Sequence, residues 1–439
     1  MMLFGLLLCA IVMLLLSGIP VAYAFGMGAL AFIWISGRPL DYMLAQAFWQ
    51  VGSFALLALP LFVLAGQLMK ASSVAERLLA FIEAVVGRLR GGIGAVTVIT
   101  CTLVGAISGS GSSAIAAIGG LMIERMTDRG YHRGYAVSLV ACSSVLAQLI
   151  PPSIPMIVFA LMTGIPVTAA FLATLVPGVL IALMYCLLNM RYAPAEPTAW
   201  PDDGATVASP DTTTYLRRVT HTFRHAAWAL FMPVLMLGGI YSGLFTPTEA
   251  AAVAVGYVIL IGTVIYRGLE PAGIGREVVN AARISGALIV ILFALAIMSR
   301  AMLLEQIPGQ ISDFLLGITD SPWASLLILN LVLLAIGMLI DDVSGSIVAA
   351  VVLWPVAQQL GLHPLHFAAI VGTNLGLGNV TPPCAPLLFM AGGIGKSQLS
   401  EYLVPTLKLT LLGHLPILLL VTFLPWVSLM LPRWLLGIG

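Results

Sequence analysis

The sequence predicts an all-α polytopic membrane protein built from inverted repeats, each with a re-entrant hairpin and a discontinuous helix. Three observations predict this fold class. Of the 439 residues, 60% are hydrophobic and only 8% are charged, whereas soluble domains carry about 25% charged residues. Apolar runs recur from one end of the chain to the other. Two of these runs are interrupted by the same tripeptide, Ser-Gly-Ser.

Ten apolar runs are expected to cross the bilayer, because each reaches or approaches the roughly 20 residues that a transmembrane helix needs. They are residues 3–17, 19–36, 52–70, 133–164, 168–190, 227–244, 249–266, 285–304, 364–394 and 402–431. We expect a single membrane domain over residues 1–439. Its parts are N-terminal scaffold spans (1–51), repeat 1 (52–192), a Pro-rich cytoplasmic linker (193–226), further scaffold spans (227–267) and repeat 2 (285–431).

Two further regions, 92–126 and 322–360, are expected to be re-entrant hairpins, because each half is short for a full crossing. The interruptions are Ser108-Gly109-Ser110 and Ser344-Gly345-Ser346. With both regions treated as hairpins, 16 of the 19 Lys and Arg residues fall on one side of the membrane. The three on the other side are Arg38, Arg300 and Arg433. The positive-inside rule then places both termini outside, which in a bacterial inner membrane is the periplasm.

Composition and motifs exclude several classes of function. The net charge of +1 and the absence of basic clusters argue against nucleic-acid binding. The sequence has no GxxxxGK[ST] phosphate loop, so ATP is not expected to drive the protein directly. His363 and His366 lack further ligands nearby, and no transition-metal site is expected. An intramembrane hydrolase using a serine and Asp341 is disfavoured, because no plausible base accompanies them.

An internal repeat relates the two hairpin regions. Each Ser-Gly-Ser is followed by a predicted broken helix, 133–164 or 364–394, that contains Pro-Pro-x-x-Pro. The prolines are Pro151, Pro152 and Pro155 in the first unit and Pro382, Pro383 and Pro386 in the second. An apolar span and a weakly amphipathic arm precede each hairpin. Inverted repeats with broken helices are typical of secondary transporters, whose binding site lies where the breaks meet.

Broken segments at membrane depth need partners for their backbone groups, and a bound ligand can supply them. Free carbonyls at helix C-termini suit a small cation, and free amides at helix N-termini suit an anion. We therefore predict two cation sites. The first uses Ser108, Gly109, Ser110, Ser112, Ser113 and Pro151. The second uses Asp341, Ser344, Gly345, Ser346, Thr373, Asn374 and Thr381. An organic acid is expected to lie between them, at Pro152, Ser153, Asn379 and Pro383, with Arg300 as an attracting charge.

Each of these readings has a structural alternative. The glycines and serines could simply allow close helix packing, as small residues do in membranes. Asp341 could bind a cation or carry a proton, and it could equally solvate the mouth of the second hairpin together with Asp342. Arg300 could extend to the outer interface as an ordinary flanking residue.

At 105–119, 148–155, 341–350 and 372–386, the chain resembles the large membrane subunit, or DctM component, of tripartite ATP-independent periplasmic (TRAP) transporters. The resemblance covers nearly the whole chain. It implies a sodium-coupled elevator that works with a small four-helix membrane subunit (DctQ-type) and a periplasmic substrate-binding protein (DctP-type) delivering an organic acid. No organic cofactor is implied. The alternative is a stand-alone sodium- or proton-coupled carboxylate or ion carrier that needs no binding protein.

Overall fold

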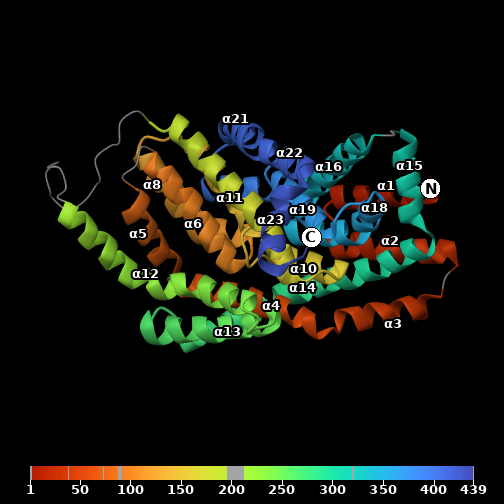
Figure 1. The fold of residues 1–439 in the computed structure, drawn as a ribbon, viewed down its shortest axis with the longest axis horizontal. Helices are drawn as coiled ribbons and strands as arrows, with labels where there is room; N and C mark the ends of the chain where they lie inside the picture. The colour runs from red at the N-terminus through yellow and green to blue at the C-terminus, as the bar shows by residue number, and fades with distance from the viewer. Residues whose placement is uncertain are drawn as a thin grey trace.

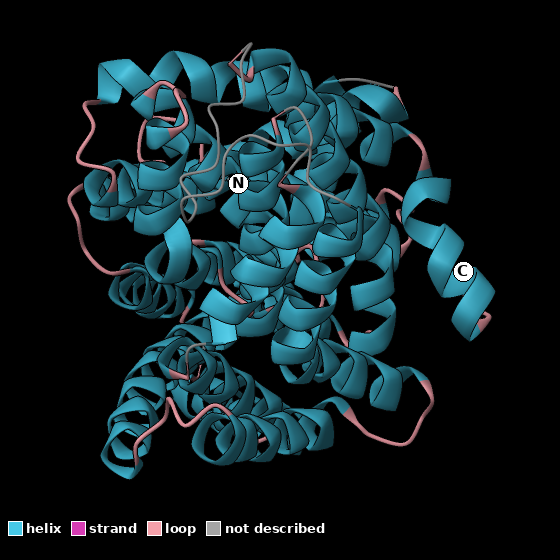
Figure 2. Ribbon diagram, turned by 90° about the vertical axis from the view of Figure 1, so that its left-hand side faces the viewer, coloured by secondary structure: helices cyan, strands magenta, loops and turns pink. Residues whose placement is uncertain are grey.

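The computed structural model describes residues 2–37, 39–72, 74–87, 91–194, 212–318 and 321–438. Within these ranges the protein is helical, with short 3-10 and π segments and no strand (Figure 2). Figure 1 shows an elongated body in which α12, α13, α14 and α3 line one long edge. The predicted all-α fold is confirmed.

The first half of the chain contains eleven α-helices among its described residues. They are α1 (Met2–Leu16), α2 (Val21–Ser36), α3 (Leu40–Val51), α4 (Ala58–Ala71), α5 (Val74–Val86), α6 (Gly92–Ser108), α7 (Gly111–Ala114), α8 (Gly120–Asp128), α9 (Arg133–Ser144), α10 (Ile154–Thr163) and α11 (Val167–Tyr192). Short 3-10 segments η1 (Phe54–Leu57) and η3 (Val145–Gln148) and the π segment η2 (Ile115–Gly119) lie between them.

The second half repeats this order. Its helices are α12 (Thr212–Tyr241), α13 (Pro247–Leu260), α14 (Pro271–Leu304), α15 (Ile307–Ile318), α16 (Pro322–Leu339), α17 (Asp342–Val348), α18 (Trp354–Gln359), α19 (Pro364–Asn379), α20 (Pro386–Ile394), α21 (Leu399–Leu409), α22 (Leu415–Phe423) and α23 (Pro425–Leu436). The π segments are η4 (Ile261–Ile265), η5 (Ala349–Leu353) and η6 (Thr410–His414).

Six continuous helices in the described chain are long and apolar enough to cross a membrane, and each coincides with one of the ten predicted crossings. The predicted spans 3–17 and 19–36 are the shorter helices α1 and α2. The predicted spans 133–164 and 364–394 are broken, each into two helices, as the Pro-Pro motifs indicated.

Some boundaries differ from the prediction. The linker predicted over 193–226 is shorter, because α12 already begins at Thr212, and residues 195–211 lie outside the described chain. The last predicted span, 402–431, ends at Phe423, where Leu424 leaves the helical region and α23 begins as a separate short helix. Helix α3 was not predicted; its 12 residues are too short to register as a crossing.

Reciprocal contacts relate the two halves. Helix α4 of the first half packs against α13 of the second, and α14 of the second packs against α2 of the first. Likewise, α10 contacts α17 and η5 of the second hairpin, while α20 contacts α7 and η2 of the first. Each hairpin tip therefore lies against the second half of the other unit's broken helix, which brings both tips and both breaks to the centre of the molecule.

The register of the repeat differs from the one that the Ser-Gly-Ser motifs suggested. The first hairpin breaks at Gly109 and Ser110, but the second breaks at Ile340 and Asp341, and Ser344-Gly345-Ser346 lies inside α17. The Asp341 carboxylate starts α17 early by accepting hydrogen bonds from the first backbone amides of that helix. Ser110 and Asp341 are thus equivalent, and each precedes its Pro-Pro pair by 41 positions.

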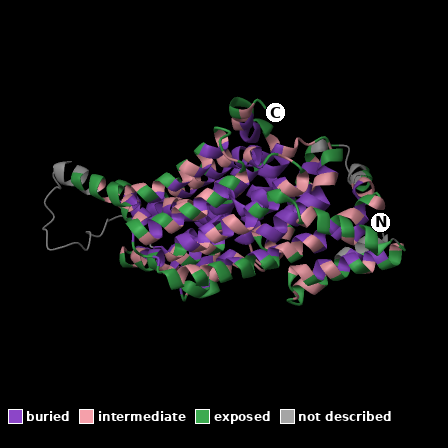
Figure 3. Cartoon of the chain, turned by 90° about the horizontal axis from the view of Figure 1, so that it is seen from below, coloured by how far each residue is buried: buried purple, intermediate pink, exposed green. Residues whose placement is uncertain are grey.

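The distribution of buried and exposed residues agrees with this arrangement of the helices. The interior of the elongated body is almost continuously buried, and exposed residues lie along its outside (Figure 3). Many exposed side chains are large and apolar, among them Trp34, Trp49 and Phe54. Such a surface suits hydrocarbon, so the chain is a multi-pass membrane protein.

Candidate functional site

A cavity of about 310 Å³ lies where the two hairpin tips and the two broken helices meet. Its lining comes from eight helices, α4, α6, α7, α10, α14, α17, α19 and α20, and from the breaks between them. The lining residues are Val63, Gln67, Ser108, Ser110, Ser112, Ser113, Ile154, Ile284, Leu288, Asp341, Asp342, Val343, Asn379, Pro386, Leu387 and Met390. The fold thus brings together residues from both predicted sites, although they lie more than 200 positions apart in the chain.

The first hairpin tip contributes hydroxyl groups and a tight backbone turn. Gly109 has a φ of 66°, which only glycine adopts readily, and its carbonyl accepts a hydrogen bond from the Ile154 amide at 3.3 Å. Ser108 Oγ lies 3.2 Å from the Gly105 carbonyl and 3.3 Å from that of Ser110. The hydroxyls of Ser110 and Ser112 are 2.9 Å apart. Ser113 completes this wall of the cavity.

The break in the first broken helix, between η3 and α10, lies next to that tip. The Pro151–Pro152 peptide bond is cis, and both prolines are buried. Ser153 Oγ donates to the Gln148 carbonyl at 2.7 Å and accepts from the Met156 amide, so this hydroxyl caps α10. Neither Ser153 nor the two prolines line the cavity, although all three were predicted to contact a ligand. Gln148 is buried, and both polar atoms of its side chain lack a hydrogen-bond partner within the described chain.

The second hairpin tip carries two carboxylates. Asp341 Oδ2 accepts from the amides of Val343 at 3.1 Å and Ser344 at 3.2 Å, so Asp341 is the N-cap of α17. The Asp342 carboxylate accepts only from the Val343 amide among the contacts described. Ser344 Oγ is fully buried and has no hydrogen-bond partner in the described chain, whereas Ser346 Oγ donates to the Asp342 carbonyl at 2.8 Å. Of the two serines, Ser344 therefore has the free hydroxyl.

Gly345 lies between them and serves packing, since a Cβ there would lie 3.0 Å from Leu375 of α19. This contact holds the second hairpin tip against the broken helix of its own unit. For this glycine the structure supports the packing alternative.

The second break repeats the cis Pro-Pro geometry at Pro382–Pro383. Asn379 lines the cavity, and its Nδ2 has no partner within the described residues. Thr381 Oγ1 donates to the Leu377 carbonyl at 2.6 Å. Pro383 is exposed but does not line the cavity. By position, Asn379 is the counterpart of Gln148, because each lies three residues before its Pro-Pro pair.

Thr373 and Asn374, further back on α19, face protein rather than the cavity. Thr373 Oγ1 donates to the Ala369 carbonyl at 2.8 Å, and the Thr373 carbonyl lies 2.8 Å from His414 Nε2. Asn374 Nδ2 donates to the Asn330 side chain at 2.7 Å, but Asn374 Oδ1 is buried without a partner in the described chain. The predicted ligand set is thus split between the cavity and the packed interior behind it.

Arg300 does not reach the cavity. Its guanidinium donates to the Tyr42 hydroxyl at 2.7 Å and lies 5.4 Å from the centre of the Tyr42 ring. Tyr42 belongs to α3, the helix that was not predicted. The structure thus places Arg300 in a contact between α14 and α3 rather than beside the predicted substrate.

Two walls of the cavity were missed from the sequence. Val63 and Gln67 of α4 form one, and Ile284 and Leu288 of α14 form the other. Each pair is spaced four residues apart on the helix that precedes a hairpin, so the repeat itself could have indicated them. At Gly66 the α4 backbone approaches the first tip so closely that a Cβ would lie 2.8 Å from the Ser108 carbonyl oxygen.

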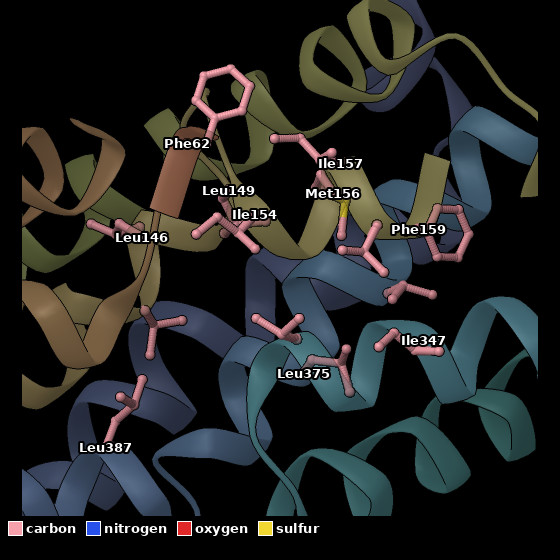
Figure 4. Close-up of a cluster of buried hydrophobic side chains, with 14 of the residues drawn as sticks. Phe62, Leu146, Leu149, Ile154, Met156, Ile157, Phe159, Ile347, Leu375 and Leu387 are labelled. Carbon is pink, nitrogen blue, oxygen red and sulfur yellow. The ribbon is translucent and has the colours of Figure 1, made fainter. Parts of the chain in front are cut away.

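An apolar cluster holds the tips and breaks together around the cavity (Figure 4). It joins α4, both broken helices and the second hairpin. Its labelled members are Phe62, Leu146, Leu149, Ile154, Met156, Ile157, Phe159, Ile347, Leu375 and Leu387. Burying each such side chain contributes about 1.5–3 kcal/mol, so the cluster favours movement of both units' central parts as one body.

The polar groups of the cavity are oxygen ligands and two side-chain amides. They are four serine hydroxyls, two carboxylates and the amides of Gln67 and Asn379, and no Lys, Arg or His among the described residues lines the cavity. Hydroxyl, carboxylate and carbonyl oxygens are the ligands that hard cations prefer. The described residues contain no group of three or more His, Cys, Asp or Glu side chains that could hold a metal ion. The chemistry of the cavity fits an alkali cation better than a transition metal.

Comparison with known proteins decides the family. Residues 8–427 match the family described as "Tripartite ATP-independent periplasmic transporter, DctM component". The chain belongs to the DctM family of TRAP transporters. It is 33% identical to the C4-dicarboxylate TRAP transporter large permease protein DctM of Rhodobacter capsulatus, over 99% of this chain and 98% of that protein. DctM proteins of this kind are transporter permeases, so the chain is a transporter component and not an enzyme.

A second relative is longer than this chain. The isethionate TRAP transporter permease protein DctMQ of Oleidesulfovibrio alaskensis is 35% identical over 94% of this chain, and the match spans 63% of the relative's length. Among solved structures, the YdaH transporter of Alcanivorax borkumensis covers 94% of this chain with a TM-score of 0.68 at 13% identity. That likeness supports the fold alone.

Proposed function

We propose that this DctM chain carries a small organic anion into the cell together with sodium, through the cavity between the two hairpin tips. The observation that carries the proposal is the composition of that cavity. Asp341, Asp342 and four serine hydroxyls line it, and no basic side chain of the described residues does. An anion entering such a cavity meets like charge, which costs free energy unless cations accompany it. Coupling to sodium removes that cost.

The unpartnered polar atoms support the same proposal. Asn379 Nδ2 lies at the cavity, Ser344 Oγ and Asn374 Oδ1 belong to segments beside it but do not line it, and all three atoms are buried without hydrogen-bond partners in the described chain. A buried polar group left unpaired costs about 1–3 kcal/mol. Such atoms persist where a ligand or water satisfies them in the working protein. At the first hairpin tip, the hydroxyls of Ser108 and Ser110 and the neighbouring backbone carbonyls would be the ligands of the first predicted cation site.

We propose an elevator mechanism for the movement. The hairpins and broken helices form the moving body, and the members of the Figure 4 cluster other than Phe62 of α4 hold it together. Helices α4 and α14 belong to the fixed scaffold and close the cavity on one side with Val63, Gln67, Ile284 and Leu288. In the other state the moving body would carry the cavity away from this wall. The close approach at Gly66 would then exist in one state only.

We further propose that the chain works with two partners, a small membrane subunit and a periplasmic substrate-binding protein. The name of the isethionate relative combines M and Q, and the chain matches only 63% of that relative. This supports a DctQ-type partner for the part of the transporter that the chain represents. The substrates named for the relatives, isethionate and C4-dicarboxylates, are small anions, which a cavity of about 310 Å³ can hold.

Reconstituted transport tests the proposal. The chain and its small subunit are placed in proteoliposomes, and uptake of radiolabelled succinate and isethionate is followed with and without the cognate binding protein. We expect the proteoliposomes to accumulate either succinate or isethionate. Accumulation should require both an inward sodium gradient and the binding protein.

A potassium gradient of equal size is the control. Uptake that proceeds equally well with potassium would contradict sodium coupling. Uptake that needs sodium but not the binding protein would instead support the stand-alone carrier.

A further inference from the structure

A second cavity, of about 350 Å³, lies outside the transport site. It is formed by the turn between α8 and α9 with the start of α9, by the end of α11 and by the last two turns of α21. Its lining residues are Gly130, Tyr131, His132, Tyr135, Tyr192, Pro194, Pro405 and Lys408. By the distribution of Lys and Arg, all three segments lie on the predicted cytoplasmic side. Nothing in the transport mechanism uses this cavity.

Aromatic rings form its rigid wall. The rings of Tyr131 and Tyr135 stack with centres 5.9 Å apart, and Tyr135 lies at the same distance from Tyr192. The Tyr135 hydroxyl donates to Asn189 Oδ1 at 3.5 Å, while Asn189 Nδ2 donates to the Gly91 carbonyl at 2.7 Å. This network fixes the wall to the start of the first hairpin, so the cavity exists before any ligand arrives.

Three hydrogen-bond donors belong to the cavity. Lys408 Nζ lies 5.7 Å from the centre of the Tyr192 ring. His132 Nδ1 accepts from the Gly134 amide at 3.2 Å, so the proton of the neutral ring is on Nε2, which can donate. The Tyr131 hydroxyl is buried and has no hydrogen-bond partner in the described chain. Among the described residues no acidic side chain lines the cavity, although Glu401 lies close enough to His132 to interact with it. Cationic and neutral donors suit an anion.

The surroundings of Lys408 indicate where that anion comes from. On the continuous helix formed by α21 and η6, Val404 and Leu411 flank Lys408 and expose 55% of their surface each. They lie on the same face of the helix as Lys408, four residues before it and three after it. An apolar strip beside a cationic, tyrosine-lined cavity matches the two parts of a phospholipid, the acyl chain and the headgroup. Basic pockets between helices on the cytoplasmic side commonly bind anionic headgroups.

We propose that this cavity binds the phosphate group of an anionic phospholipid, with Lys408, His132 and Tyr131 as donors. The acyl chains lie along the exposed apolar strip of α21. Because the cavity joins α9 and α21, the lipid links the two repeat units at the cytoplasmic surface.

Thermal stability in nanodiscs tests this site. The purified chain with its small subunit is placed in phosphatidylcholine nanodiscs, and its melting temperature is followed as phosphatidylglycerol replaces part of the lipid. We expect a saturable rise in melting temperature. Lys408→Ala should require about fivefold more phosphatidylglycerol for the same rise. Lys70→Ala, at an exposed lysine on the same predicted side, is the matched control and should respond like the unmodified protein.

The Tyr131→Phe variant distinguishes an effect on lipid binding from an effect on folding. Removing a buried hydroxyl that has no protein partner should leave the melting temperature in phosphatidylcholine unchanged or raise it. The same variant should show a smaller response to phosphatidylglycerol. An equal response of Lys408→Ala, Tyr131→Phe and the unmodified protein would overturn the proposal. Inorganic phosphate is tested in parallel, and stabilisation by phosphate without any effect of phosphatidylglycerol would overturn the assignment to lipid.

Discussion

Asp341→Asn is expected to reduce sodium-driven transport by about a hundredfold while leaving the protein folded. Asp341 caps α17 by accepting from the amides of Val343 and Ser344. Asparagine caps a helix about as well as aspartate, so the variant keeps this function. What it loses is a negative charge in a cavity that has no basic residue, and the affinity for a cation should fall accordingly. Transport is measured in proteoliposomes and stability by the melting temperature.

Asp342→Asn is the matched control. Asp342 also lines the cavity, but it is the first residue of α17, whereas Asp341 lies at the break itself, at the position equivalent to Ser110 in the first unit. We expect a loss of less than tenfold. Asp341→Ala should in addition lower stability by about 1 kcal/mol, because alanine cannot cap. Normal transport by Asp341→Asn would show that Asp341 is a helix cap and nothing more.

Ser344→Ala is expected to raise the sodium concentration for half-maximal transport by about tenfold. The Ser344 hydroxyl is buried with no partner in the described chain, so its removal costs no internal hydrogen bond. If the hydroxyl is a cation ligand, the lost interaction is worth about 1–3 kcal/mol. Sodium dependence of the initial uptake rate measures it directly.

Ser346→Ala serves as the control, two residues further along the same helix. The Ser346 hydroxyl donates to the Asp342 carbonyl, so its removal should leave the sodium dependence within about twofold. The Ser-Gly-Ser motif alone makes the two serines look equivalent. Equal effects of the two substitutions would contradict the assignment of the free hydroxyl to Ser344.

Local signals predicted the breaks but not all of their details. Gly109 marked the first tip correctly, because a tight turn needs positive φ. The second tip was misplaced by one helical turn, since Ser344-Gly345-Ser346 looks like the first motif while Asp341 performs the capping. The Pro-Pro pairs gave the correct register, because two consecutive prolines remove two backbone donors and interrupt a helix, whereas a single proline such as Pro177 lies within the continuous helix α11.

Features that depend on packing between distant helices could not be predicted. Gln67 reaches the cavity only because α4 crosses the first hairpin at Gly66. His414 and Tyr185 are both fully buried and meet at 3.0 Å across 229 positions of sequence, and neither belongs to a motif. Arg300 was assigned to the substrate from its charge alone, and its contact with Tyr42 followed from the unpredicted helix α3.

The melting temperature of the chain with its small subunit, measured against NaCl, tests most directly whether the cavity region binds sodium. Ionic strength is held constant with choline chloride. A ligand that binds only the folded state stabilises it by about 2.7 kcal/mol at 100 times its Kd. We expect a saturable rise that sodium produces and potassium does not. A melting temperature that is indifferent to sodium would contradict the proposed sodium sites.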